Sequence, residues 1–100
     1  MLPYVFHPHA AAEFEAAVAY YESVASGKGM EFAAQVQAAI EYICLFPEAA
    51  PVTRGTVRSK GVQPTTRWRY TIHYRFTPNG IRILAVAHHR RQPFYWIARR

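Results

Sequence analysis

The side chains of this chain that are best suited to chemistry are cationic, and they lie almost entirely in its second half. Ten arginines and Lys60 lie in residues 51–100, which hold no acidic residue, so this half carries +11. Residues 1–50 hold all six glutamates together with Lys28 and carry −5. Guanidinium and ammonium groups bind carboxylates and phosphates. The uneven distribution of charge therefore predicts an anionic partner.

Histidine and cysteine offer a second kind of chemistry, which the sequence does not favour. His7 and His9 lie near the N-terminus, and His88 and His89 are adjacent to one another. Adjacent residues of a strand point to opposite faces, and no cysteine accompanies these histidines as a zinc ligand. Cys44 falls beside the apolar stripe of a helix, where we expect a small buried side chain. We therefore predict no metal site and no cofactor.

The elements that must position the basic residues follow from hydrophobic periodicity. Residues 2–6 form a short apolar run and predict a brief strand. Apolar residues then recur every three or four positions, which predicts a helix over residues 9–25 and a second one that carries Phe32 to Phe46 and stops at Pro47. Gly27 and Gly29 permit a tight reversal between them. The first half should thus form an antiparallel helix hairpin.

Periodicity changes to two in the second half. Residues 67–76 alternate large apolar with basic or polar side chains, which predicts a half-buried strand. Asn79-Gly80 predicts a two-residue turn, and residues 81–88 read as the returning strand. Residues 56–62 should add a third antiparallel strand. The expected fold is α+β, with a short N-terminal strand and a helix hairpin packed on a three- or four-stranded antiparallel sheet.

This turn fixes the pairing of the hairpin and hence its two faces. Phe76 should lie opposite Ile83, Tyr74 opposite Ala85 and Ile72 opposite Ala87, which gives an apolar face for the helices. The reverse face would then be cationic and hold Arg67, Arg69, His73, Arg75, Arg82 and His88, with Arg58 and Lys60 from the neighbouring strand. Solvated faces of antiparallel sheets usually need no function, but they mix both signs of charge. We therefore predict that these residues bind a target or another anion.

Length and composition restrict the class of protein. One hundred residues suit a single domain over residues 1–100. One cysteine excludes an intramolecular disulfide and favours a reducing compartment, so we expect the cytoplasm. No segment approaches the roughly 20 consecutive apolar residues of a membrane helix, and no secretion signal is expected.

The C-terminal stretch carries a resemblance to a known family. An apolar strand ends in His88, and Arg90, Arg91, Pro93, Tyr95, Trp96 and Arg99 follow it. This pattern resembles the RelE/ParE superfamily of toxins from type II toxin-antitoxin systems, most closely the ParE-type plasmid-stabilisation branch. Pro8, Tyr20-Tyr21, Phe46-Pro47, Arg58 and the Tyr70 to Arg75 strand fall in family order as well. Residues 61–66 depart from the pattern.

The resemblance implies one of two activities. RelE-type toxins cut messenger RNA on the ribosome, which requires closely placed bases, acids and cations around the phosphate. In that case Arg90 or Arg91 would stabilise the transition state, His88 would move protons, and Tyr95 would stack or donate. ParE-type toxins instead inhibit DNA gyrase by binding. We favour gyrase, because only Arg58 and Lys60 match the basic strand of the RelE branch. A nucleic-acid-binding module without toxicity is the third alternative.

The resemblance also implies a protein partner. Toxins of these systems inhibit growth and are neutralised by a cognate antitoxin, so we expect a hetero-oligomer with an antitoxin segment that is disordered alone. The basic sheet face favours an acidic segment. The target would be DNA gyrase or, alternatively, the ribosome and its messenger RNA. We expect the terminal Arg99-Arg100 pair to be solvated.

Overall fold

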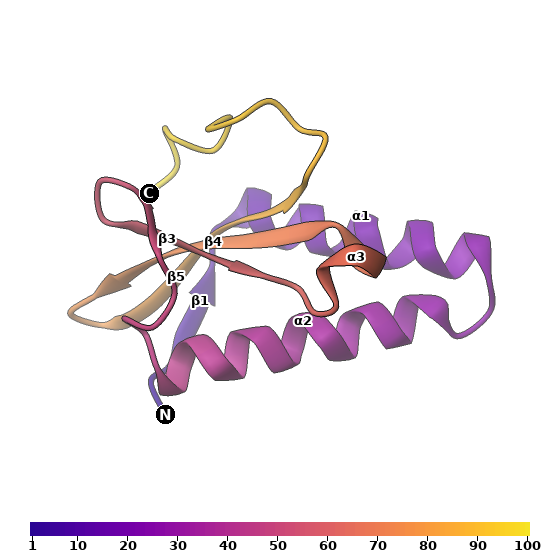
Figure 1. The fold of residues 1–100 in the computed structure, drawn as a ribbon, viewed down its shortest axis with the longest axis horizontal. Coiled ribbons are helices and arrows are strands. Elements are labelled where there is room, and N and C mark those ends of the chain that lie inside the picture. The colour runs from indigo at the N-terminus through magenta and orange to yellow at the C-terminus, as the bar shows by residue number, and fades with distance from the viewer.

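A helix hairpin lies on one face of a five-stranded sheet, as the computed structural model of residues 1–100 shows (Figure 1). In chain order the elements are β1 (Tyr4–Phe6), α1 (Pro8–Val24), α2 (Lys28–Leu45), β2 (Val52–Arg54), β3 (Val57–Gly61), α3 (Thr65–Trp68), β4 (Tyr70–Thr77) and β5 (Gly80–His88). The strand order is β1-β5-β4-β3-β2, and only β1 and β5 are parallel. The predicted α+β class is confirmed, and the sheet is larger than expected because β1 and β2 both join it.

The helix hairpin begins and reverses as predicted. Pro8 occupies the first turn of α1, and the ring Nδ1 of His7 accepts a hydrogen bond from the amide of His9 at that helix start. Gly27 adopts a φ of 86° between the helices, a left-handed value that favours glycine. Gly29 lies so close to α1 that an added Cβ would be 2.6 Å from the carbonyl oxygen of Val18. Glycine therefore sets how closely α1 and α2 approach.

The β4–β5 hairpin has a different register from the predicted one. Phe76 pairs with Ile81 and Tyr74 with Ile83, while Thr77 pairs with Gly80 around a turn centred on Pro78-Asn79. The carbonyl oxygen of Pro3 would lie only 2.4 Å from a Cβ at position 80, where φ is +122°. Gly80 is therefore needed inside the strand, where β1 approaches, and not at the centre of the turn.

A β-bulge then changes which side chains of β5 face the helices. Register shifts between His73 and Tyr74, so that Ile83 pairs with Tyr74 and Ala85 pairs with His73, leaving Leu84 as the extra residue. Ile81, Ile83 and Val86 join the core under the helices, whereas Ala85 and Ala87 lie on the reverse face with Trp96. The predicted pair Tyr74–Ala85 is wrong because the turn is shifted, and Ile72 pairs with Val86 instead of Ala87 because the bulge adds one residue to that shifted register.

Residues 67–69 do not belong to the predicted strand. Arg67 and Trp68 lie in the short helix α3, and Arg69 ends it with a φ of 57°. Trp68 is 1% exposed and packs against Tyr21 and Phe32 of the helix hairpin. Burial of this large side chain outweighs the strand pattern, because an aromatic residue of this size contributes several kcal/mol when it leaves water.

The main core lies between the helices and the sheet. Its largest fully buried members include Phe32, Ile40, Ile43, Ile72 and Tyr74. Cys44 is buried there as predicted, and burial raises the pKa of its thiol. No helix has the length and apolar character that crossing a membrane requires.

Candidate functional site

The reverse face of the sheet is covered by residues 89–100, which we call the C-terminal segment (Figure 1). Trp96 is 2% exposed and packs on Ala85 and Ala87, whose small side chains leave room for the indole. Its ring also stacks on that of His73 of β4. The segment, β2, β4 and the end of β5 line an open pocket of about 250 Å³. The predicted open cationic face is therefore largely covered.

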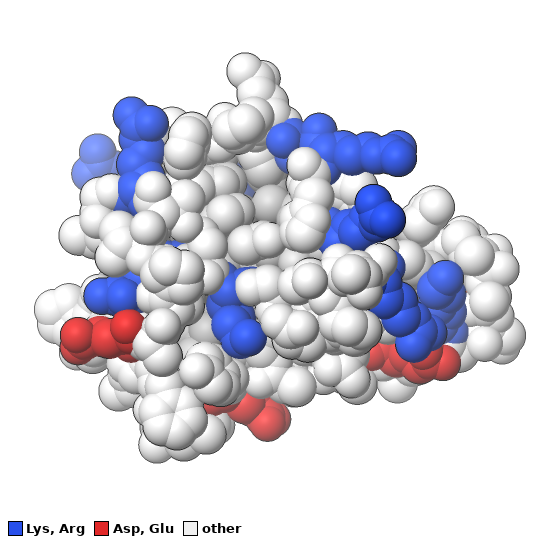
Figure 2. Space-filling view, in the orientation of Figure 1, with Lys and Arg blue, Asp and Glu red and all other residues white.

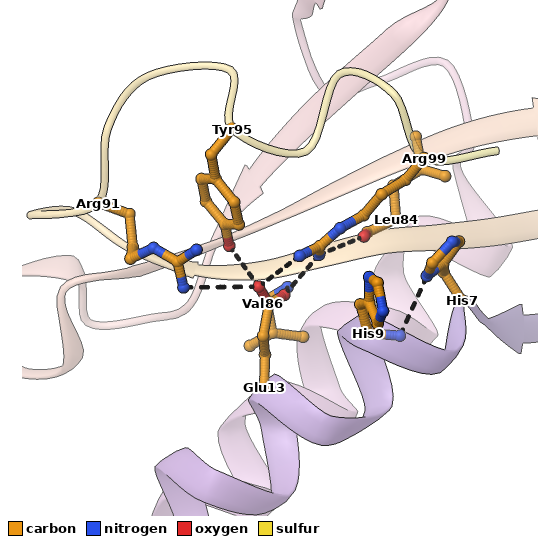
Figure 3. Close-up of polar contacts among 8 residues, drawn as sticks. All are labelled: His7, His9, Glu13, Leu84, Val86, Arg91, Tyr95 and Arg99. Atoms are coloured by element: carbon orange, nitrogen blue, oxygen red, sulfur yellow. Dashed lines mark hydrogen bonds and ion pairs between the residues drawn. The ribbon is translucent and has the colours of Figure 1, made fainter.

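A single carboxylate, that of Glu13 in α1, joins the helix hairpin to the C-terminal segment (Figure 3). Arg99 donates two hydrogen bonds to it, at 2.9 and 3.0 Å, and Tyr95 donates its hydroxyl at 2.8 Å. The amide of Val86 donates a fourth at 3.1 Å. The guanidinium of Arg91 lies 3.8 Å from the same carboxylate and 3.8 Å from the centroid of the Tyr95 ring. We call Glu13, Arg91, Tyr95 and Arg99 the Glu13 cluster.

The Glu13 cluster holds its charges in place. Burial raises the pKa of Glu13, but hydrogen bonds from Arg99, Tyr95 and Val86 lower it more, so the group is ionised. Burial and the hydrogen bond to Glu13 raise the pKa of the Tyr95 phenol. Burial also lowers the pKa of Arg99, and the neighbouring carboxylate raises it above its ordinary value. The cluster is thus a set of fixed charges, with the Tyr95 proton tightly held.

The other two candidate catalytic residues lie outside this cluster. His88 is on the helix side of β5, edge-on to Tyr70, in a groove that is also lined by Glu13 and Tyr20 of α1 and by Arg91. Its Nδ1 accepts a hydrogen bond from the amide of Arg90 at 3.0 Å. Burial, followed by the charges of Arg90 and His89, lowers the pKa of His88. The side chain of Arg90 is exposed.

The predicted anion-binding residues do not share one face, which corrects the expectation from sequence. Arg58 pairs with Tyr74 and Lys60 with Ile72, so both lie on the helix side of β3. Arg58 donates to the carbonyl oxygens of Glu48 and Ala50, and Lys60 lies over the ring of Tyr42 in α2. Both are therefore used to hold α2 and the residues after it.

The remaining predicted residues divide between α3 and the sheet. Arg67 forms an ion pair with Glu31 of α2, and Arg69 is exposed at the end of α3. Arg75 and Arg82 are opposite one another on the reverse face, and the buried Nε of Arg75 has no hydrogen-bond partner. His73 lies on that face too and accepts or donates a hydrogen bond with Ser59 at 2.7 Å. Of the predicted residues, only His73, Arg75 and Arg82 lie on the predicted face of the sheet.

The basic half is partly neutralised by the acidic half. Of the twelve basic residues, Arg67, Arg91 and Arg99 lie within ion-pair distance of a glutamate. On the face that Figure 2 shows, the red side chains lie in the lower part of the view, and blue side chains lie above them and close to them. The segregation of charge along the sequence thus becomes close contact between the two halves.

Sequence reasoning missed Glu13 and misplaced Arg99. The side chain of Arg99 is only 13% exposed, and it donates a further hydrogen bond to the carbonyl oxygen of Leu84 at 3.0 Å, so the expectation of a solvated end is wrong for it. One signal was available in the sequence. Glu13 lies three residues after Ala10 and four before Ala17, both of which are buried in the main core, so a carboxylate at this position is directed toward the fold.

Comparison with known proteins agrees with this architecture. The family model described as ParE toxin of type II toxin-antitoxin system, parDE, matches residues 4–93, which include every helix and strand. No curated protein matches the sequence. The match covers β1, the helix hairpin, the sheet and the start of the C-terminal segment, and it confirms the resemblance seen in the sequence. The chain therefore belongs to the ParE toxin family of type II toxin-antitoxin systems, in which a toxin is paired with a cognate antitoxin.

Proposed function

We propose that this toxin inhibits growth by binding DNA gyrase and performs no chemistry of its own. Its family, together with the resemblance to the ParE-type branch, implies gyrase as the target. The observation that carries the proposal is the position of Glu13, whose carboxylate lies between Arg91, Tyr95 and Arg99. Arg91, a cation that a nuclease of this type would use at the phosphate, thus lies beside an internal anion.

Physical chemistry supports binding over cleavage. A carboxylate beside Arg91 repels the phosphate that a nuclease must stabilise. Tyr95 donates its proton to Glu13 and is a poor general acid or base at neutral pH because its pKa is raised. His88 lines the same groove as Glu13 and Arg91, but its Nδ1 accepts the amide of Arg90 and it forms no hydrogen bond with the Glu13 cluster. These groups suit a rigid binding surface.

The residues available to a partner are the exposed cations without a carboxylate. Arg54, Arg69 and Arg90 are of this kind, and Arg54 lies over the partly exposed ring of Phe94. We propose that they bind acidic groups of gyrase together with Arg91. Contacts of this kind contribute individually modest free energies, so single substitutions should weaken inhibition in graded steps.

The experiment that tests the target measures DNA and protein synthesis by pulse labelling within minutes of induction without antitoxin. Early loss of DNA synthesis with intact translation is expected, together with inhibition of supercoiling by purified gyrase. Immediate loss of translation would contradict the proposal and favour messenger RNA cleavage. Intact synthesis of both would favour a nucleic-acid-binding module without toxicity.

A panel of variants separates binding from catalysis. Arg90→Ala, Arg91→Ala and Tyr95→Ala should each reduce gyrase inhibition by a graded factor. In a nuclease at least one of them would abolish cleavage while ribosome binding remained. Arg67→Ala is the matched control, because Arg67 is paired with Glu31 near α3. A loss with the control as large as with Arg90→Ala would point to unfolding and contradict a defined surface.

The cognate antitoxin should neutralise the toxin partly through charge. We propose that an acidic antitoxin segment covers exposed cations of this surface, consistent with the net charge of +6. Affinity should therefore fall as salt rises, because exposed charges more than roughly 3 Å apart are screened at about 1 M ionic strength. Calorimetric titration at low and high salt measures this, and an affinity independent of salt would contradict it.

A further inference from the structure

The outer edge of β5 is only half covered by a strand. β1 pairs with Ile81, Arg82 and Ile83 and then ends, and the last strand hydrogen bond joins the amide of His7 to the carbonyl oxygen of Ile83. β5 continues to His88. Unpaired backbone groups at such an edge need partners or water, and an open edge invites pairing with another chain. The backbone amide and carbonyl groups of β5 beyond Ile83 therefore need other hydrogen-bond partners.

Two side chains take the place of the missing strand. The amide of Val86 donates to Glu13 at 3.1 Å, and the carbonyl oxygen of Leu84 accepts from Arg99 at 3.0 Å. Leu84 is the extra residue of the bulge, so its carbonyl has no regular place in the β-ladder. Glu13 and Arg99 also bind each other through two hydrogen bonds. Their ion pair thus covers the β5 edge and ties it to both α1 and the C-terminal segment.

We propose that Glu13 is a positioning residue of this toxin: by covering the β5 edge and holding Tyr95 and Arg99, it fixes the arrangement in which Arg90 and Arg91 meet the target. The proposal rests on the proposed function, in which these arginines bind gyrase. Glu13 positions Arg91 in two ways. The guanidinium of Arg91 lies 3.8 Å from the carboxylate of Glu13, and it lies over the ring of Tyr95, whose hydroxyl is bound to the same carboxylate. Glu13 itself is mostly buried and unsuited to touch a large partner, with a side chain 15% exposed.

The effect of Glu13 should be separable from folding. Trp96 with Ala85 and Ala87 forms a second apolar cluster that anchors the middle of the C-terminal segment without Glu13. Loss of the carboxylate should therefore loosen both ends of the segment while the helix hairpin and sheet persist. Glu15 provides the matched control, since it lies on the same helix, is exposed, and forms no hydrogen bond or ion pair with another side chain.

The test compares Glu13→Gln, Glu13→Asp and Glu15→Gln in the full chain. In Glu13→Gln, amide hydrogen exchange at Val86 and in residues 89–100 should rise by at least about tenfold, because hydrogen bonds to a charged group are lost. The concentration that half-inhibits gyrase supercoiling should rise by about the same factor. Glu13→Asp should restore part of the protection from exchange and part of the inhibition. Glu15→Gln should match the wild type in both measurements.

A spectroscopic signature distinguishes positioning from general loss of stability. Several tyrosines, Tyr21, Tyr70, Tyr74 and Tyr95, should ionise above the ordinary range in a titration of tyrosine absorbance, because burial raises the pKa of each. Only Tyr95 also donates its proton to a carboxylate, that of Glu13. In Glu13→Gln the pKa of one phenol, that of Tyr95, should move down toward the ordinary range of about 10 while those of the other tyrosines stay unchanged. Glu15→Gln should leave the titration unchanged.

Several outcomes would overturn the proposal. Normal gyrase inhibition by a Glu13→Gln chain with fast exchange in the C-terminal segment would do so, since the arrangement of the segment would then be irrelevant. If the wild type fails to inhibit gyrase, the proposed target is wrong, and growth arrest by the same variants is measured instead. Loss of growth arrest in Glu13→Gln alone supports the positioning role of Glu13, and equal growth arrest by all variants overturns it. If Glu13→Gln does not fold, Tyr95→Phe replaces it, and unchanged inhibition by that folded variant overturns the proposal.

Discussion

Trp96 stacks on His73 across the contact between the C-terminal segment and the sheet, with ring centroids 4.6 Å apart and planes inclined by 26°. This pair is the apolar anchor of the segment, and Ala85 and Ala87 complete it. It explains how a segment without helix or strand remains in one place on the sheet.

Removal of the indole should destabilise the fold strongly. Trp96→Ala loses a side chain that is 2% exposed and should lower the free energy of unfolding by about 3–5 kcal/mol, because the cavity cannot fully collapse. Urea denaturation followed by circular dichroism measures the change. Ile97→Ala is the control: the neighbouring side chain is 52% exposed, so the change should stay within about 0.5 kcal/mol. Equal losses would show that the indole is not an anchor.

The burial of His73 beneath Trp96 predicts that the fold loses stability in acid. Burial lowers the pKa of His73 from 6.5 to about 4, an effect that the charge of Glu13 opposes and that of His89 reinforces. The unfolded chain therefore binds a proton before the folded chain does, and stability should fall as pH drops from about 6.5 toward 4, by on the order of 3 kcal/mol. Denaturation across this range measures it. His73→Gln should flatten the dependence, and an unchanged slope would assign it to other groups.

Gly29 should tolerate no side chain. In Gly29→Ala the new Cβ would lie 2.6 Å from the carbonyl oxygen of Val18, so α1 and α2 must separate. We expect a loss of about 1–3 kcal/mol despite the better helix propensity of alanine. Thermal unfolding checks this against Ala34→Ser at an exposed position of α2, which should cost about 0.5 kcal/mol. A more stable Gly29→Ala chain would contradict the close contact.

The ion pair between Glu31 and Arg67 should matter little, in contrast to Glu13. Its side chains are 57% and 50% exposed, so water screens the attraction. Glu31→Gln should change the free energy of unfolding by less than about 1 kcal/mol. The difference should vanish near 1 M salt, where the Debye length is about 3 Å. A larger loss that persists in high salt would mean that α3 depends on this pair.

Most of the fold was predictable from sequence, and the failures have physical causes. The helix hairpin lies where periodicity placed it, because each helix has one apolar side, and β3 lies within the expected residues 56–62. β5 is apolar at nearly every position from Ile81 to Ala87, so no pattern revealed the bulge at Leu84. The strand pattern of residues 67–76 was followed only from Tyr70 onward, because Trp68 is buried between the helices.

The candidate site was predictable in its members but not in their arrangement. The family pattern identified Arg91, Tyr95 and Arg99, which do come together. Their common partner is Glu13, which lies far away in sequence and in a helix whose other glutamates are exposed. A contact of this kind depends on how α1 is placed against β5, which local periodicity does not specify.

The distribution of charge along the chain also orders events during synthesis. α1 and α2 contact each other locally and contain five of the six glutamates, whereas every arginine follows them. A ribosome delivers the acidic hairpin first, and domains fold progressively from the N-terminus as they are made. The arginine-rich residues are therefore made after a counter-charged helix hairpin, and Arg99 can bind Glu13 only once that hairpin is already present. The C-terminal segment is thus the last part of the fold to be fastened.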